Sequence, residues 1–126
     1  MTATRRPLIL IVEDNAANLL LATSVLERAQ MDVVSAATVQ QARGLMRSAP
    51  PDLVLMDVML PDGDGLELTR ELKTSPGTAS TPIVALTARA FKSDEEAAAA
   101  AGCDGFISKP VDTRTLAEQV RRFLPT

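Results

Sequence analysis

The sequence contains no histidine and a single cysteine, Cys103. Without histidine the chain lacks the usual general base and the Ser-His and Cys-His pairs that activate nucleophiles in many enzymes. One cysteine permits no internal disulfide, and a metal site built from cysteine and histidine ligands is excluded as well. This composition fits a reducing cytoplasm, where we expect the protein to reside.

Long apolar runs and strong basic charge are also missing. No run approaches the roughly 20 residues that cross a membrane, and the five apolar residues before Glu13 are too few for the core of a signal peptide. The net charge is −3, and no block of like charge is longer than residues 94–96, which argues against nucleic-acid binding by a basic face. The length suits one domain, so we expect residues 1–126 to form a single domain, with no second domain.

Short apolar runs alternate with helical patterns along the chain. Strands are predicted at residues 8–12, 33–36, 53–57, 82–86 and 105–108. Helices are predicted at residues 16–29, 38–48, 64–74, 94–101 and 112–124. Asn15 is a candidate N-cap, Ser93 and Glu96 form a candidate capping box, and Gly102 is a candidate C-terminal cap. This alternation predicts an α/β fold with a five-stranded parallel sheet covered by helices on both faces.

Polar residues stand where four of the five predicted strands end. These residues are Glu13 and Asp14 after the first strand, Asp57 at the third, Thr87 at the fourth and Lys109 at the fifth. The carboxyl ends of parallel strands share one edge of the sheet, which is where ligands bind in such folds. We therefore expect three carboxylates, one hydroxyl and one amine to converge in a shallow cleft.

Clustered carboxylates repel one another, so they either share a proton or bind a cation. Oxygen ligands suit a hard ion, and a few carboxylates with water suit Mg²⁺ better than Ca²⁺. Such a metal would bring a phosphoryl donor to Asp57, while Lys109 and the Thr87 hydroxyl hold phosphoryl oxygens. Asp57 is then free to act as a nucleophile and form an acyl phosphate. Residues 62–65, Asp-Gly-Asp-Gly, lack the later ligands of a Ca²⁺ loop, so we predict a turn there.

Four fragments at these strand ends resemble the receiver domain of bacterial two-component response regulators. They are residues 12–15 (VEDN), 55–61 (LMDVMLP) with Gly65, 86–88 (LTA) and 106–110 (FISKP). The resemblance extends from Leu8 to Leu124 and implies a single receiver domain with a doubly wound, flavodoxin-like (βα)5 fold and strand order 2-1-3-4-5. Within the family, the sequence looks closest to single-domain cell-cycle regulators and to the receivers of hybrid kinases.

The resemblance also implies a site and a partner. Asp57 would accept a phosphoryl group from a histidine kinase or a histidine phosphotransfer protein. Mg²⁺ would be the cofactor, and its ligands would be Asp14, Asp57, the backbone carbonyl of Met59, and Glu13 through water. The Lys109–Pro110 peptide bond would be cis. Met59 and Arg89 stand at positions that tune water attack on the acyl phosphate in this family, and we expect Met59 to shield it.

A switch is implied in the same way. Thr87 moves toward the phosphoryl group and vacates space that Phe106 fills. The change reaches the face made by the fourth helix, fifth strand and fifth helix, where a downstream protein would bind. The domain would act as a phosphoacceptor with possible autodephosphorylation, without turnover catalysis, as a monomer or weak dimer. The sequence does not choose between signalling to a separate effector and relaying phosphate onward.

Three alternative functions fit parts of the pattern. A haloacid dehalogenase-type phosphohydrolase would need an acid two residues after its nucleophile, where Met59 stands. A nucleotide-binding flavodoxin-like module would need a phosphate loop rich in glycine or hydroxyls after the first strand, but residues 14–17 are Asp-Asn-Ala-Ala. A degenerate receiver that only binds partners is disfavoured because every key residue is present. Phe106, taken alone, also fits an ordinary core position.

Overall fold

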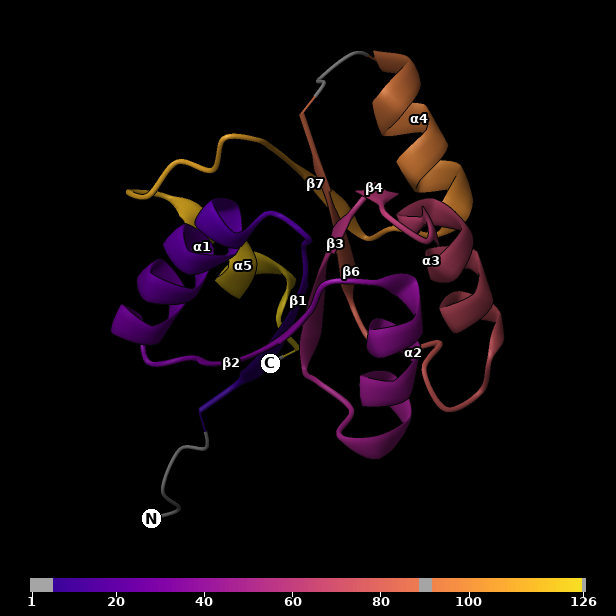
Figure 1. The fold of residues 1–126 in the computed structure, drawn as a ribbon, viewed down its shortest axis with the longest axis horizontal. Helices are drawn as coiled ribbons and strands as arrows, with labels where there is room; N and C mark the ends of the chain where they lie inside the picture. The colour runs from indigo at the N-terminus through magenta and orange to yellow at the C-terminus, as the bar shows by residue number, and fades with distance from the viewer. Residues whose placement is uncertain (1–5, 89–91, 126) are drawn as a thin grey trace.

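A five-stranded parallel sheet forms the centre of the protein, which we describe from a computed structural model for residues 6–88 and 92–125. Its strands are β1 (Leu8–Val12), β2 (Asp32–Ala36), β3 (Leu53–Asp57), β6 (Ile83–Thr87) and β7 (Gly105–Ser108). They lie side by side in the order β2-β1-β3-β6-β7 (Figure 1). The two remaining strands, β4 (Met59–Leu60) and β5 (Gly63–Asp64), pair only with each other as an antiparallel hairpin. The predicted strand order is therefore confirmed, since the sheet strands follow the order second, first, third, fourth and fifth.

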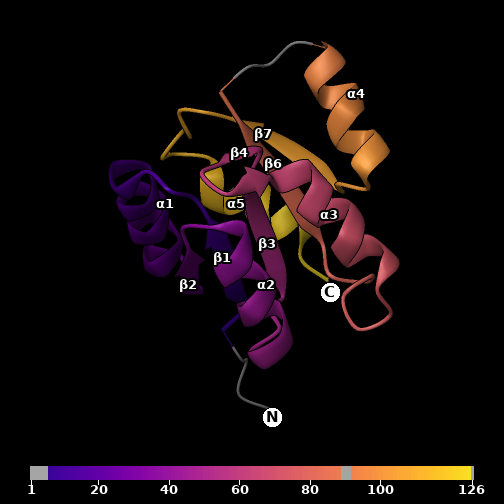
Figure 2. The ribbon, with the colours of Figure 1, turned by 45° about the vertical axis from the view of Figure 1, so that its right-hand side comes forward.

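Five helices cover the two faces of this sheet. They are α1 (Ala16–Arg28), α2 (Val39–Ser48), α3 (Gly65–Thr74), α4 (Lys92–Ala101) and α5 (Leu116–Phe123). Helices α1 and α5 lie on one face, and α2, α3 and α4 lie on the other (Figures 1 and 2). Within the described ranges, no helix is both long and apolar enough to span a bilayer.

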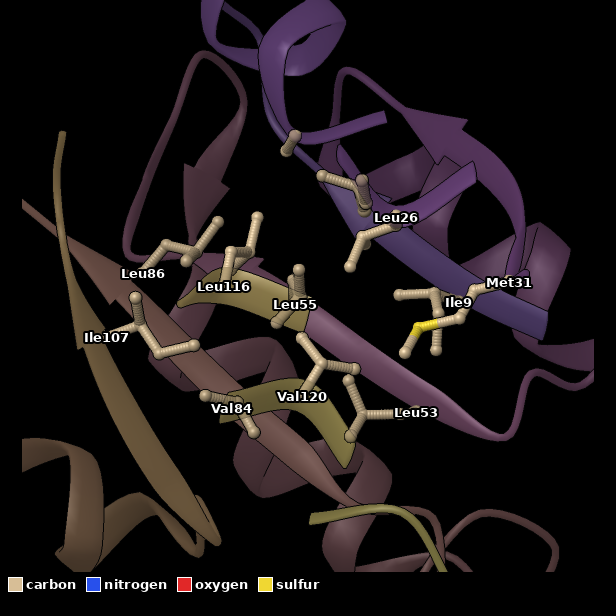
Figure 3. Close-up of a cluster of buried hydrophobic side chains, with 12 residues drawn as sticks. Ile9, Leu26, Met31, Leu53, Leu55, Val84, Leu86, Ile107, Leu116 and Val120 are labelled. Atoms are coloured by element: carbon tan, nitrogen blue, oxygen red, sulfur yellow. The ribbon is translucent and has the colours of Figure 1, made fainter. Parts of the chain in front are cut away.

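Alternation along the strands divides the core into two layers. In β1, Ile9 and Ile11 face α1 and α5, whereas Leu10 and Val12 face α2 and α3. Figure 3 shows the first layer, in which the side chains of α5 and α1 pack over the middle of the sheet. Every residue of β3 and β6 is buried, as expected for central strands of a parallel sheet.

Side-chain caps fix where three of the helices begin. Asn15, Thr38 and Asp64 each accept a backbone N–H bond within the first turn of α1, α2 and α3. The N-cap predicted at Asn15 is thus confirmed. Helix α4 ends at Ala101, and the next residue, Gly102, adopts a φ of +100°, which confirms the predicted glycine cap.

Several predicted boundaries are wrong. Helix α4 already includes Lys92, so Ser93 lies inside the helix and cannot be its N-cap. Helix α5 begins at Leu116 rather than 112, because the side chain and carbonyl of Asp112 bind the next N–H groups in a turn. The turn predicted at residues 62–65 is correct only at its start, because Pro61 and Asp62 form the tip of the β4–β5 hairpin, Gly63–Asp64 form β5 and α3 begins at Gly65.

Candidate functional site

The candidate site lies where the central strands end. Glu13 and Asp14 directly follow β1, Asp57 is the last residue of β3, Thr87 is the last residue of β6, and Lys109 follows β7. Because the strands are parallel and adjacent, all five positions fall on the same edge of the sheet. Glu13, Asp57 and Thr87 are buried, whereas Asp14 is exposed.

Lys109 joins two of the acids. Its Nζ lies 3.0 Å from Oε1 of Glu13 and 3.1 Å from Oδ2 of Asp57. Only 2% of Glu13 and 5% of Asp57 is exposed, so both carboxylates depend on this cation for compensation of their burial. Burial by itself lowers the pKa of Lys109, but the hydrogen bonds and negative charges of Glu13 and Asp57 outweigh it and raise the pKa above its ordinary value. The lysine is therefore charged throughout the neutral range.

Three carboxylates meet beside this ion pair. Oxygen atoms of Glu13, Asp14 and Asp57 all lie within 4.8 Å of one another. The donors in this cluster are oxygens only, and one carboxylate faces solvent, so the cluster fits a hard divalent cation that retains water ligands. The structure thus brings together the three carboxylates that the sequence predicts as metal ligands, and Asp14 is the exposed member of the group.

The β4–β5 hairpin covers the same edge. The amide of Met59 donates a hydrogen bond of 3.2 Å to Oδ1 of Asp57, while the Met59 side chain is 81% exposed. The amide of Gly65 donates to the carbonyl of Val58 at 2.9 Å, which brings the start of α3 against the end of β3. A Cβ at Gly65 would overlap the carbonyl oxygen of Asp57, so the close approach requires glycine there.

Thr87 and Phe106 lie on the same face of the sheet. Phe106 is opposite Ala85 and Ser108 is opposite Thr87 in the β6–β7 register, so Phe106 is diagonal to Thr87. Phe106 is half-buried, and the Thr87 carbonyl accepts a bond of 2.7 Å from the Lys109 amide. The Lys109–Pro110 bond is cis, as the resemblance implies. Arg89 lies outside the described residues.

One contact at the hairpin was not anticipated from the sequence. Asp62 accepts hydrogen bonds from the backbone N–H groups of Val39 and Gln40, at the start of α2. The two partners are more than 20 positions away in the chain, and no local pattern links them. The one available signal was the absence of an acidic residue in the first turn of α2, which leaves the helix dipole to be balanced from elsewhere.

Comparison with known proteins decides the family. The family model of the response regulator receiver domain matches residues 9–121. The chain belongs to this family. It is 36% identical over 116 residues to the polar-differentiation response regulator DivK of Brucella ovis, which spans 92% of this chain and 94% of that protein. The receiver assignment, and with it membership of two-component signalling, is therefore confirmed.

Solved receiver structures have the same architecture. The chemotaxis response regulator CheY4 of Vibrio cholerae superposes with a TM-score of 0.90 at 25% identity, covering 95% of this chain and 100% of that one. The receiver domain of a histidine kinase from Syntrophus aciditrophicus gives a TM-score of 0.85 at 31% identity, covering 94% and 89%. The chain is thus similar both to response regulators and to the receiver domain of a histidine kinase.

Proposed function

We propose that this receiver domain accepts a phosphoryl group on Asp57 in an Mg²⁺-dependent reaction and signals through a phosphorylation-controlled protein interaction. The donor is a histidine kinase or a histidine phosphotransfer protein, and the setting is the cytoplasm. The observation that supports this most directly is the bridge from Lys109 to Glu13 and Asp57 at the carboxyl edge of the sheet. It joins a buried candidate nucleophile to a cation that can bind a phosphoryl oxygen.

Asp57 supplies the reacting atom. In the proposed step, a carboxylate oxygen of Asp57 attacks the phosphorus of a phosphohistidine, the O–P bond forms as the N–P bond breaks, and the released imidazole retains the electron pair and takes up a proton. The Met59 amide and Lys109 Nζ each bind one oxygen of the carboxylate and fix its plane. Lys109 is then placed to bind a phosphoryl oxygen, and the Thr87 hydroxyl to bind another.

The acidic cluster is the proposed Mg²⁺ site. Asp14 and Asp57 would bind the ion directly, Glu13 through water, and Met59 through its backbone carbonyl. When bound, the ion supplies positive charge that offsets repulsion between the incoming phosphoryl group and the carboxylates. Glu13 also accepts a bond of 3.2 Å from the Asn15 amide, which holds its carboxylate at the turn between β1 and α1.

Output is proposed to pass through Thr87 and Phe106 to the face formed by α4, β7 and α5, where a downstream protein binds. Their placement on one face of the sheet supports this pairing, because movement of the Thr87 side chain frees space next to Phe106. The domain is a phosphoacceptor in this proposal, and its modification is stoichiometric rather than catalytic. A monomer or weak dimer and a single domain over residues 1–126 stay predictions.

Intact mass tests the proposal. Wild type, Asp57→Asn and Asp32→Asn are incubated with acetyl phosphate and Mg²⁺, and again after chelation of the metal. Asp32 is an exposed acid at the far end of β2, so its variant controls for nonspecific effects of replacing an aspartate by asparagine. We expect one phosphoryl group on wild type and Asp32→Asn, and none on Asp57→Asn or without metal. Equal labelling of Asp57→Asn, or no labelling of wild type, contradicts the proposal.

A further inference from the structure

A carboxylate in the β4–β5 hairpin serves as the acidic residue that helix α2 lacks. Oδ1 of Asp62 accepts the Val39 N–H at 2.7 Å, and Oδ2 accepts the Gln40 N–H at 3.2 Å. The Thr38 hydroxyl accepts the next donor, the Gln41 N–H, at 3.1 Å. Three of the first N–H groups of α2 are thereby bound, two of them by a segment that is distant in the sequence.

An apolar contact accompanies these bonds. Gly63 lies against the Val39 side chain so closely that a Cβ on Gly63 would be 3.2 Å from Cγ2 of Val39. The bond from the Val39 N–H, together with the one from Gln40, holds the pKa of Asp62 below its ordinary value. Asp62 is therefore ionised at neutral pH, and the hairpin is attached to the start of α2 by both charge and packing.

The same hairpin reaches the phosphoacceptor from its other strand. Met59 pairs with Asp64, and Leu60 pairs with Gly63, so main-chain pairing joins the two strands. The Met59 amide then bonds to Oδ1 of Asp57. A continuous set of contacts thus runs from the α2 N-terminus through Asp62 and the hairpin to the Asp57 carboxylate.

We propose that Asp62 is a positioning residue, which fixes the Met59 main chain at Asp57 and so sets the affinity of the acidic cluster for a divalent cation. The proposal rests on the metal site proposed above. Met59 is the one hairpin residue bonded to the cluster in the described structure, and it belongs to a strand of two residues that pairs with β5. Asp62 does not touch the reacting atoms and acts through Met59.

A reciprocal effect follows from linkage. If the Asp62 contact raises cation affinity, then bound cation must strengthen the Asp62 contact by the same factor. Cation binding would then stabilise the first turn of α2, a helix that contributes none of the carboxylates in the cluster. If Asp62 only capped α2, the stability of this first turn would not depend on the bound cation.

The test compares Mg²⁺ affinity among purified variants by calorimetry. We expect Asp62→Ala to raise the Mg²⁺ Kd roughly tenfold, the lower end of what loss of groups supporting metal ligands costs. The Asp62→Asn variant keeps one acceptor oxygen, so its Mg²⁺ Kd should lie between those of the wild type and Asp62→Ala. This variant is measured instead if Asp62→Ala does not fold. The control is Glu71→Gln, which weakens a contact between α2 and α3, the Arg43–Glu71 ion pair, and leaves both hydrogen bonds of Asp62 in place. We expect it to leave the Kd unchanged.

Hydrogen exchange of the Met59 amide gives a second readout that does not need the metal. In Asp62→Ala this amide should exchange faster than in wild type, and in Glu71→Gln it should not. If Asp62→Ala lowers stability but leaves both the Mg²⁺ Kd and Met59 exchange at wild-type values, Asp62 is only a helix cap and the inference is wrong. If the wild type binds no Mg²⁺, the proposed metal site is wrong. If the wild type binds Mg²⁺ and Asp62→Ala binds it with the same Kd, only the inference about Asp62 is wrong.

Discussion

Gly65 lies directly against the main chain of Asp57, so a Cβ at position 65 would overlap the Asp57 carbonyl oxygen. It would also come within 3.1 Å of the Met56 side chain. The contact lets the Gly65 amide bind the Val58 carbonyl and brings the first turn of α3 to the edge of the site. The glycine of the receiver pattern is therefore a steric requirement of the turn that follows Asp57.

Replacement of Gly65 by alanine should lower the free energy of unfolding by about 1–3 kcal/mol, because the added methyl group forces the turn away from Asp57. The variant should also be phosphorylated more slowly. Urea unfolding and the rate of labelling by acetyl phosphate measure the two effects. The control is Gly44→Ala, since Gly44 lies inside α2 and an added Cβ would have no atom within 4 Å apart from its chain neighbours and the backbone of its own helix. The free energy of unfolding of Gly44→Ala should rise by about 0.5–1 kcal/mol, and its rate of phosphorylation should equal that of the wild type. If Gly65→Ala has wild-type stability and a wild-type rate, the steric argument is contradicted.

Loss of the Lys109 cation should destabilise the protein most when no metal is present. In Lys109→Met the buried carboxylates of Glu13 and Asp57 lose their bridge, and we expect the free energy of unfolding to fall by about 3 kcal/mol. Mg²⁺ should restore part of this loss, because it supplies positive charge to the same cluster. Urea unfolding with and without Mg²⁺ provides the comparison.

Lys73→Met is the matched control for that experiment. The side chain of Lys73 is 16% exposed, as that of Lys109 is, but Lys73 binds Asp104, away from the acidic cluster. The loss of stability in Lys73→Met should therefore be the same with and without Mg²⁺. If the loss of stability in Lys109→Met does not depend on Mg²⁺, the idea that Lys109 and the metal balance the same charges is contradicted.

The contribution of Lys109 to stability should also depend on pH. Because the pKa of Lys109 is raised on folding, its stabilising contribution is complete below the ordinary lysine pKa and is lost as the pH rises through the higher folded value.

Met59 should slow hydrolysis of the acyl phosphate. Its side chain is 81% exposed beside Asp57, where a bulky apolar group can exclude an attacking water. We expect Met59→Asn to lose its phosphoryl group several-fold faster than wild type, measured by intact mass after removal of the donor. Leu20→Asn, at an exposed apolar position on α1, is the control. An unchanged or slower loss in Met59→Asn would rule out shielding.

Helix α4 should exchange its amide hydrogens faster than α2. Both helices have ten residues and two buried side chains, but those of α4 are alanines, Ala98 and Ala101, whereas α2 buries Ala42 and Met46. The smaller buried area secures α4 less firmly. Hydrogen exchange followed by mass spectrometry compares the two helices directly. Protection of α4 equal to that of α2, with or without a phosphoryl mimic, would contradict the idea that α4 shifts easily.

Much of the fold was predictable because it depends on local signals. Continuous apolar runs such as residues 53–56 mark buried parallel strands, and Asn15 marks a helix start through a bond to a nearby amide. The errors arose where the chain makes irregular contacts. Asp112 forms a turn that delays α5, and the β4–β5 hairpin has too few residues for any period to appear.

The site was predictable in its members but not in its supports. Glu13, Asp57 and Lys109 could be grouped because parallel strands place their ends on one edge, and the structure brings these three within bonding distance. The contact of Asp62 with α2 was not predictable, because it joins the hairpin to the start of a helix that is close to it only in the folded chain. Sequence patterns thus group the polar residues at the edge of the sheet more readily than the residues that support them.

The most direct test of the account is to locate the phosphoryl group chemically. After incubation with acetyl phosphate and Mg²⁺, borohydride reduces an aspartyl phosphate to homoserine, which peptide mass spectrometry then assigns to a position. We predict homoserine at position 57 in the donor-treated protein and nowhere in protein treated with borohydride alone. Homoserine at position 14, a reduced glutamate at position 13, or no reduced residue at all would contradict the assignment of Asp57 as the phosphoacceptor.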